Sequence, residues 1–333
     1  MNTLTPMAIM ALFILTGGCV SPVWFVPVNY PGETYQRIFL EEKSGARFYA
    51  EDGLADARWM EIERGDGSGF VGGYLSTNME HRGAIIVMLD GATVWLSENS
   101  EGGAKYWHTH DAVLYRSYGF MTFSPALPEC ATAYGERDLA DLIEAVDWLD
   151  RQGRSLWNIE RIYVLGYSKG ATLAALLNRS RQVTALVGLG GLYEPDQLRN
   201  LFGIYSVLAS LAPDNEGLCQ LGATLDYYAS PESGGWDTLD VVGHLEELHS
   251  PMLFIHGTAD LVWSVRNTRH VEERYTRLRA DGVELPPLEF MYLKNGSHKD
   301  VRNTPEARNR VLAYLEQFEP VPLTELSEAN PGN

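Results

Sequence analysis

The sequence predicts an α/β fold with a mostly parallel β-sheet and helices on both faces of that sheet. Two observations support this prediction. Short apolar runs, typical of strands buried on both faces, alternate along the chain with segments of helical periodicity. Hydrophobic residues make up 45% of the 333 residues, which is enough for a large core. Alternating strands and helices imply right-handed crossovers, and because α/β folds often exceed the usual domain size, we expect one large domain with an insertion rather than two equal domains.

The predicted elements follow one another in a regular order. Strands are expected over residues 58–64, 70–77, 84–89, 120–123, 185–189, 251–256 and 288–293, and in the run that begins at Arg161. Helices are expected over 108–118, 137–152, 266–281 and 305–318, and in the Ala/Leu-rich run after Ser168. Residues 97–105 are expected to form a loop. Gly153 is expected to end the helix 137–152, and Pro305 suits the first turn of the last helix.

Composition predicts the boundaries of the main domain, which we place at 57–318. Residues 19–56 are rich in Pro, Gly and aromatic residues, so we expect a linker that runs into irregular structure. From about 193 to 249 the strand–helix alternation breaks into short pieces rich in Gly, Pro and Ser, which indicates a cap insertion over the carboxyl edge of the sheet. Residues 319–333 are polar and contain Pro, so we expect a flexible tail.

The first 18 residues are expected to be a signal peptide, because the apolar run 7–15 is too short to span a bilayer. The run ends in Leu15-Thr16-Gly17-Gly18-Cys19, which resembles the lipobox of bacterial lipoproteins. The resemblance implies that Cys19 is lipidated and anchors the protein in the bacterial cell envelope, on the periplasmic or outer side. The alternatives are an ordinary signal peptide of a secreted or periplasmic protein, and a buried N-terminal helix.

The net charge limits the partners that the protein could bind, and its cysteine content bears on the compartment in which it folds. The net charge of −18 leaves no basic stripe to neutralise phosphates, which argues against nucleic acid and against electrostatic attachment to an anionic membrane. Two cysteines remain beside Cys19. Cys130 and Cys219 could pair in an oxidising compartment, whereas in a reducing one they would be small core residues.

The most informative motif is Gly166-Tyr167-Ser168-Lys169-Gly170, a Gly-x-Ser-x-Gly sequence between the run from Arg161 and the Ala/Leu-rich helix. A strand that turns sharply into a helix exposes the side chain at the turn, and the two glycines remove Cβ atoms that would collide there. Ser168 then lies at a helix N-terminus, which favours developing negative charge. This layout predicts a nucleophile. A chance match in a glycine-rich turn is the alternative.

An acid and a histidine follow Ser168 in the order that a nucleophilic serine needs. Asp260 follows the strand 251–256, and His298 follows the strand 288–293. A serine hydroxyl needs a base to take its proton, and the base needs a carboxylate to fix its tautomer. Separately, Asp260 could cap the next helix and His298 could be a surface residue; together they predict a Ser168–His298–Asp260 triad.

Neighbouring polar residues are weaker candidates. Asp300 adjoins the histidine in sequence and should be solvated, and His256 is expected to pack or hydrogen-bond at its strand end. His108 and His110 have the spacing of a strand face or a loose metal pair, but no carboxylate or cysteine completes a site. We therefore expect no metal and no cofactor.

These motifs resemble those of the α/β-hydrolase superfamily, and most of all its prolyl-oligopeptidase-like and dienelactone-hydrolase-like branches. The matching sequences are Gly166-Tyr167-Ser168-Lys169-Gly170, His256-Gly257-Thr258-Ala259-Asp260, Gly296-Ser297-His298 and Ala145-Val146-Asp147-Trp148-Leu149, within residues 82–318. The resemblance implies an α/β-hydrolase fold and the triad order, and says little about substrate.

The resemblance also implies an oxyanion hole made of backbone N–H groups, here those of Lys169 and Ala92. The superfamily often has His-Gly after the strand 84–89, where this chain has Asp90-Gly91. An acidic side chain there would oppose an oxyanion unless it points away. The Lys169 side chain could place positive charge at a pocket mouth, or it could be solvated.

The expected function is hydrolysis of carboxylic esters through an acyl-enzyme. A serine peptidase of the prolyl-oligopeptidase-like type is the alternative with the same chemistry, and the substrate would then be a short peptide rather than a small ester. A non-catalytic, lipid-anchored binding protein on a hydrolase fold is the alternative from another class.

Overall fold

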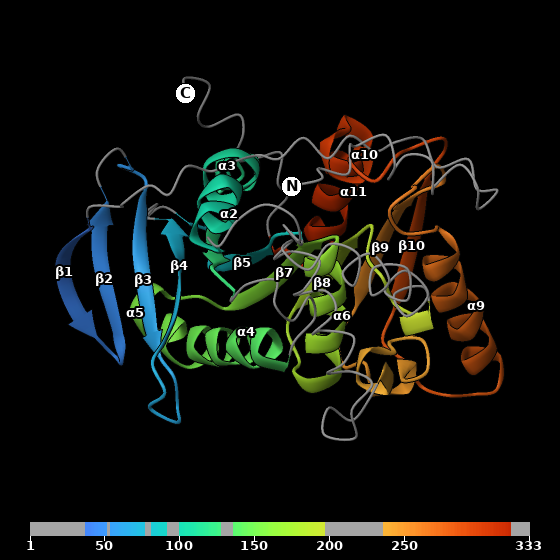
Figure 1. The fold of residues 1–333 in the computed structure, drawn as a ribbon, viewed down its shortest axis with the longest axis horizontal. Helices are drawn as coiled ribbons and strands as arrows, with labels where there is room; N and C mark the ends of the chain where they lie inside the picture. The colour runs from blue at the N-terminus through green and yellow to red at the C-terminus, as the bar shows by residue number, and fades with distance from the viewer. Residues whose placement is uncertain are drawn as a thin grey trace, which may run out of the picture.

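A computed structural model describes residues 37–51, 54–76, 81–91, 100–127, 136–196 and 236–320. Its strands form one sheet in the order β1-β2-β3-β4-β6-β5-β7-β8-β9-β10. Figure 1 shows this sheet running from β1 on one side of the molecule to β10 on the other. The strands from β6 to β10 in that order run parallel, whereas β1 to β4 form an antiparallel meander that joins the rest through the antiparallel pair β4–β6. The predicted α/β class with a mostly parallel sheet is confirmed.

Every predicted strand is present within one or two residues of its expected ends. The bounds are β1 Arg37–Lys43, β2 Ala46–Glu51, β3 Ala57–Glu63, β4 Phe70–Ser76, β5 Ala84–Leu89, β6 Met121–Pro125, β7 Arg161–Tyr167, β8 Ala185–Leu189, β9 Met252–Gly257 and β10 Leu288–Leu293. All side chains of β5 are buried. A strand covered on both faces reads as a continuous apolar run, which is why the sequence located it so well.

The helices cover both faces of the sheet, as Figure 1 shows. Their bounds are α2 Ser100–Tyr106, α3 Ala112–Ser117, α4 Glu136–Trp148, α5 Arg154–Trp157, α6 Lys169–Ser180, α9 Arg266–Ala280, α10 Asp300–Asn303 and α11 Pro305–Glu316, with π-helical turns η1 Trp107–Asp111 and η3 Leu149–Gly153 and 3₁₀ turns η5 Trp236–Leu239 and η6 Leu245–Glu247. One core lies between the sheet and α4, α6 and α9, and the other lies under α3, α10 and α11. Ile85 and Ile86 of β5 point into opposite cores.

The expectation of irregular structure over 19–56 is wrong for Arg37 to Glu51, where β1 and β2 form a hairpin. Ser44 and Gly45 make the two-residue turn, both with positive φ (55° and 75°). Such turns match the twist of paired strands. The strand pattern was hidden because β1 is an edge strand with largely exposed side chains, so it shows no apolar alternation.

Two helix boundaries also differ from expectation. The helix expected over 108–118 begins at Ser100, inside the expected loop 97–105, and contains the π-helical turn η1. Gly153 does not stop the helix 137–152, because η3 and α5 continue to Trp157. The helix ends at Asn158, whose left-handed φ of 53° is a conformation that Asn adopts more readily than most residues.

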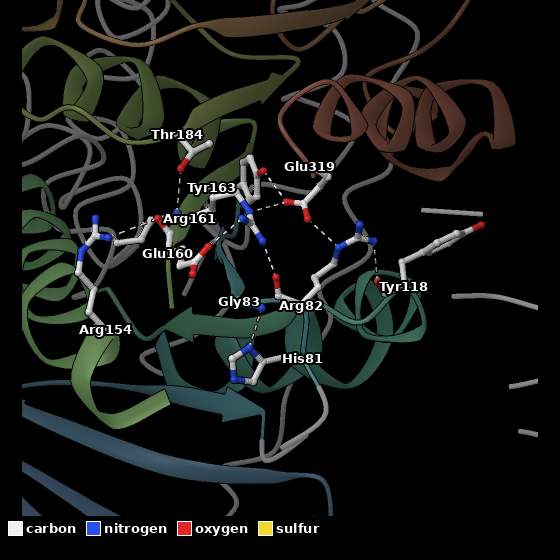
Figure 2. A network of polar contacts seen from close by, with 11 residues as sticks. His81, Arg82, Gly83, Tyr118, Arg154, Glu160, Arg161, Tyr163, Thr184 and Glu319 are labelled. Carbon is white, nitrogen blue, oxygen red and sulfur yellow. Dashed lines mark hydrogen bonds and ion pairs between the residues drawn. The ribbon is translucent and has the colours of Figure 1, made fainter. Parts of the chain in front are cut away.

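The predicted flexible tail 319–333 is wrong at its first residue, because the Glu319 carboxylate is fully buried. It accepts hydrogen bonds from Tyr163 Oη (2.6 Å), Arg82 Nε (2.6 Å) and Arg161 Nε (3.1 Å), a network shown in Figure 2. Arg82 precedes β5 and Arg161 begins β7, so the network ties the end of α11 to the amino ends of the central strands. A polar residue near a chain end gives no sign of such partners in the sequence.

Several predictions fall on residues outside the described ranges. They are the signal peptide 1–18 with Cys19, the cysteines Cys130 and Cys219, the oxyanion donor Ala92, residues 197–235 of the cap insertion 193–249, and residues 321–333 of the tail. In the described part of the chain, no helix combines the length and apolar character needed to cross a membrane.

Candidate functional site

Ser168 lies between the end of β7 and the start of α6 in a strained backbone conformation, with φ 53° and ψ −117°. A non-glycine residue in such a conformation costs about 1–3 kcal/mol and persists only where its surroundings hold it. Here the Ser168 N–H donates to Leu189 O at 2.8 Å. Both motif glycines are required, since a Cβ on Gly166 would lie 2.1 Å from Gly170 O and one on Gly170 would lie 2.4 Å from Leu89 O.

Asp260 and His298 lie in the loops after the neighbouring parallel strands β9 and β10. The two side chains meet, because His298 Nδ1 lies 2.7 Å from Asp260 Oδ2. A carboxylate can only accept, so Nδ1–H donates and Nε2 keeps its lone pair. The other carboxylate oxygen, Oδ1, accepts from the backbone N–H groups of Val262 (2.8 Å) and Trp263 (2.9 Å).

The Asp260 side chain is fully buried, yet its surroundings favour the charged form. Burial alone acts to raise the pKa, but hydrogen bonds from His256 and His298 and from the Trp263 amide outweigh it and hold the pKa of this carboxyl well below its usual range. Asp260 is therefore ionised at neutral pH. It can orient His298 and stabilise a positive charge on the His298 ring.

His256 is fully buried at the end of β9, where the sequence placed it as a packing or hydrogen-bonding residue. Its Nδ1 lies 2.7 Å from Thr268 Oγ1, and its Nε2 lies 2.9 Å from Trp263 O and 3.3 Å from Asp260 Oδ2. A carbonyl acceptor requires Nε2–H, so His256 is a second donor toward Asp260. This contact could not be predicted from the sequence, because it depends on the path of the loop after β9.

The end of β8 lies beside the turn at Ser168 between β7 and α6, which we call the elbow, and beside the loop that holds His298. The elbow bonds to Leu189, and the next residue, Gly190, has a left-handed φ of 61°. A Cβ on Gly190 would lie 3.2 Å from His298 Nδ1, a tight contact that would push the imidazole by a few tenths of an ångström, and the positive φ also favours glycine here. The ring of Tyr167 packs against His298 with centroids 5.0 Å apart. Ser168 and His298 thus border the same short stretch of chain.

The Lys169 side chain is not solvated, which contradicts one of the two expectations for it. It is buried, and its Nζ pairs with the buried Asp138 of α4. Burial of a carboxylate at this helix contact demands a nearby cation, which Lys169 supplies. The Lys169 backbone N–H lies in the first turn of α6, where N–H groups have no intrahelical partner. Its position beside Ser168 suits an oxyanion donor.

Asp90 directs its carboxylate toward the helical segment α2–η1. Oδ1 accepts from the Gly91 N–H at 2.6 Å and from the indole Nε1 of Trp107. Burial raises the pKa of Asp90 to about 6. The loop itself contacts the elbow, because a Cβ on Gly91 would lie 3.1 Å from Ser168 Cβ.

The remaining polar candidates do not join the site. His108 is buried with Nε2 3.2 Å from Arg116 Nη1, and burial lowers its pKa to about 4. His110 is exposed and stacks on Tyr106 with centroids 4.2 Å apart. Asp300 accepts from the Ser297 N–H at 2.7 Å at the start of α10. Within the described ranges, no group of three or more His, Cys, Asp or Glu side chains could hold a metal ion.

Solved structures with this architecture include esterases and peptidases. The Pyrococcus furiosus esterase Pf2001 matches with a TM-score of 0.58 and 16% identity over 88% of this chain and 96% of its own. Thermogutta terrifontis esterase 2, in a structure phosphonylated by cyclosarin, matches at 0.54 and 14% over 80% and 94%. The fold is that of the α/β hydrolases. The Pyrococcus horikoshii acylaminoacyl peptidase matches at 0.54 and 13% over 89% of this chain but only 52% of its own.

Likeness at this level of identity shows the α/β-hydrolase fold and not the activity. Neither a scan against protein-family models nor a search of curated proteins finds a match. The function must therefore be argued from the site.

Proposed function

We propose that this α/β-hydrolase chain is a serine hydrolase that cleaves carboxylic esters through an acyl-enzyme on Ser168. The observation that supports this most is that two features occur together at the same edge of the sheet. One is the strained Ser168 at the elbow, and the other is the 2.7 Å contact between His298 and Asp260 in the loops after β10 and β9. A fold alone does not require such strain or such a buried, ionised carboxylate. Their joint presence is what nucleophilic catalysis needs.

In the proposed mechanism, His298 Nε2 takes the proton of Ser168 Oγ as Oγ attacks the ester carbonyl carbon. Negative charge develops on the carbonyl oxygen and is bound by the backbone N–H of Lys169 and by a second N–H, proposed for Ala92. The imidazolium then gives its proton to the leaving alkoxide as the C–O bond breaks. Water repeats the sequence on the acyl-enzyme and releases the acid, with Asp260 stabilising the imidazolium in both halves.

Similarity to solved esterases supports a carboxylic ester as the first candidate substrate. This chain spans nearly the whole of the P. furiosus esterase but about half of the acylaminoacyl peptidases. Amide hydrolysis uses the same catalytic groups, so a short peptide substrate is the second candidate.

A panel of p-nitrophenyl esters of graded acyl length and of peptidyl p-nitroanilides tests the proposal. We expect turnover of at least one ester, a kcat/KM for amides far below that for esters, and loss of turnover in Ser168→Ala. Ser155→Ala, which removes an exposed hydroxyl on α5, is the matched control. Faster turnover of amides would favour the peptidase, and no turnover of either class would favour the non-catalytic binding protein.

We also propose that the mature protein carries lipid on Cys19 and faces the periplasmic or outer side of a bacterial envelope. The support is the sequence Leu15-Thr16-Gly17-Gly18-Cys19 after a short apolar run. Metabolic labelling with a radioactive fatty acid should mark the wild-type protein and not Cys19→Ser. Equal labelling of the two would contradict lipidation at this residue.

A further inference from the structure

One helical segment is bonded to both of the loops that border Ser168 and His298. The segment is the π-helical turn η1, and its first and last residues make the two connections. Trp107 donates its indole N–H to Asp90, the residue before Gly91. Asp111 accepts from Arg302 Nε (3.1 Å) and Nη2 (2.5 Å), and Arg302 lies four residues beyond His298.

The π-helical geometry places these two residues. Ala112 N–H bonds back to Trp107 O, a spacing of five residues that closes a wider turn than an α-helix makes. Both ends of the turn then reach structure outside the helix, whereas the surrounding helices α2 and α3 are regular. Insertions of this kind are frequent at functional sites, which agrees with the position of this one beside the elbow.

Arg302 is held tightly enough to transmit position. The Arg302 side chain is 16% exposed and that of its partner Asp111 is 9% exposed. The guanidinium lies over three aromatic rings, those of Tyr106 (5.2 Å), Trp107 (4.8 Å) and Tyr167 (5.4 Å). Tyr167 directly precedes Ser168 and packs on His298. The cluster therefore touches the elbow as well as both loops.

We infer that Trp107, Asp111 and Arg302 are positioning residues that hold Asp90 and Gly91, which follow β5, and the loop of His298 in register with Ser168. The inference rests on the proposed hydrolase function and adds residues that do not touch the reacting atoms. Trp107 acts through Asp90 on Gly91, and Arg302 acts through α10 on His298. Because a misplacement of about 1 Å can cost about 100-fold in rate, such contacts control turnover without contacting substrate.

Matched pairs of variants separate this role from general stabilisation. Trp107→Phe removes the indole N–H and keeps an aromatic ring. Trp148→Phe does the same at another buried tryptophan, whose Nε1 donates to Ser44 O at 2.9 Å. Asp111→Asn breaks the two-bond contact with Arg302. Asp141→Asn breaks a comparable buried contact, with Arg64 at 2.7 and 2.8 Å, against α4.

We expect kcat for the best ester to fall about 10- to 100-fold in Trp107→Phe and Asp111→Asn, with KM changed less than about 3-fold. Trp148→Phe and Asp141→Asn should keep kcat within about 3-fold of wild type. Rates are taken per folded molecule, from thermal melts of each variant. Equal kcat losses within a matched pair would overturn the inference.

Arg302→Gln breaks the same connection from the other side and should reproduce the kcat loss. If Trp107→Phe, Asp111→Asn and Arg302→Gln all fail to fold while the controls fold, the contacts serve stability and the inference is wrong. Absence of turnover in the wild type would instead contradict the proposed function.

Discussion

The parallel strands hold a buried carboxylate near their amino ends, the amino edge of the sheet, and another near their carboxyl ends, the carboxyl edge. The groups that bind these two carboxylates differ in kind. At the amino edge, Glu319 is bound by Arg82, Arg161 and the hydroxyl of Tyr163. At the carboxyl edge, Asp260 is bound by His298, His256 and two backbone amides. Arginine keeps its charge at all accessible pH values, whereas histidine gains and loses a proton near neutrality. The first arrangement can only stabilise the fold; the second can move a proton.

The carboxyl edge also holds a strained serine and a carboxylate with a perturbed pKa. Ser168 has an unfavourable backbone conformation, and Asp90 is a partly buried carboxylate whose pKa is raised to about 6. Sites that carry out chemistry commonly give up stability for geometry. Variants at the two edges should therefore separate effects on activity from effects on stability. The expected effects decrease in size from Asp260→Asn to Asp90→Asn.

The largest effect is expected for Asp260→Asn. Loss of the carboxylate removes the group that fixes the His298 tautomer and stabilises its charged form, so kcat should fall by about 10⁴-fold. Ester hydrolysis by the purified variant, corrected for its folded fraction, measures this. A loss below about 10-fold would show that Asp260 is not the orienting acid.

Glu319→Gln should have the opposite signature. Neutralising this carboxylate leaves two arginines at the amino edge without their buried counter-charge, which should lower the free energy of unfolding by about 3–5 kcal/mol. Urea denaturation measures the loss. Because the network lies at the other edge of the sheet from Ser168, kcat of the folded variant should stay within about 3-fold of wild type. A larger fall in kcat of the folded variant would contradict the proposed separation between the two edges.

Gly190→Ala should lower activity more than the addition of one methyl group would suggest. The added methyl group would lie 3.2 Å from His298 Nδ1 and must displace the imidazole, so we expect kcat to fall by about 10- to 100-fold. Gly282→Ala is the matched control, because Gly282 also has positive φ (82°) but nothing within 4 Å of the added group. The control should lose about 1 kcal/mol of stability and no activity. Similar kinetics of the two variants would contradict the close packing of His298 on Gly190.

Asp90→Asn should stabilise the protein in a pH-dependent way. The pKa of Asp90 is raised to about 6 by burial, although Trp107, Arg302 and the Gly91 amide act in the other direction and Asp111 adds repulsion. A raised folded pKa means that the charged form destabilises the folded state. The penalty is fully present above pH 6 and disappears as pH falls toward the unfolded value near 4.

The Asn variant removes this charge and keeps an oxygen acceptor for Gly91 and Trp107. It should be more stable than wild type by about 1–3 kcal/mol at pH 8 and equally stable near pH 4, as thermal or urea melts at several pH values can show. A pH-independent difference would contradict the assignment of the penalty to ionised Asp90.

The sequence predicted the central strands and the order Ser168, Asp260, His298 because those features depend on local pattern. The strand Ala84–Leu89 is continuously apolar, and Gly166 and Gly170 mark the close crossing of β7 and α6. The fold class followed from these patterns and is confirmed. Asp260 and His298 were candidates because each follows a predicted strand, and sites in parallel sheets gather at the carboxyl ends of the strands.

Contacts between distant segments could not be predicted. Lys169 looked like a charge beside a pocket, and its burial against Asp138 depends on how α4 packs on α6. Glu319 looked like the start of a tail, and its partners come from residues more than 150 positions away. Strand β1 of the β1–β2 hairpin has too little burial to show an apolar pattern. The role of His256 beside Asp260 required the shape of one loop.

The most direct test of the account is to react the purified protein with a fluorophosphonate probe and map the adduct by peptide mass spectrometry. The proposed mechanism predicts a single adduct on the peptide that contains Ser168, lost in Ser168→Ala and formed much more slowly in Asp260→Asn. Absence of an adduct under conditions that label known serine hydrolases, or an adduct on another residue that persists in Ser168→Ala, would contradict it.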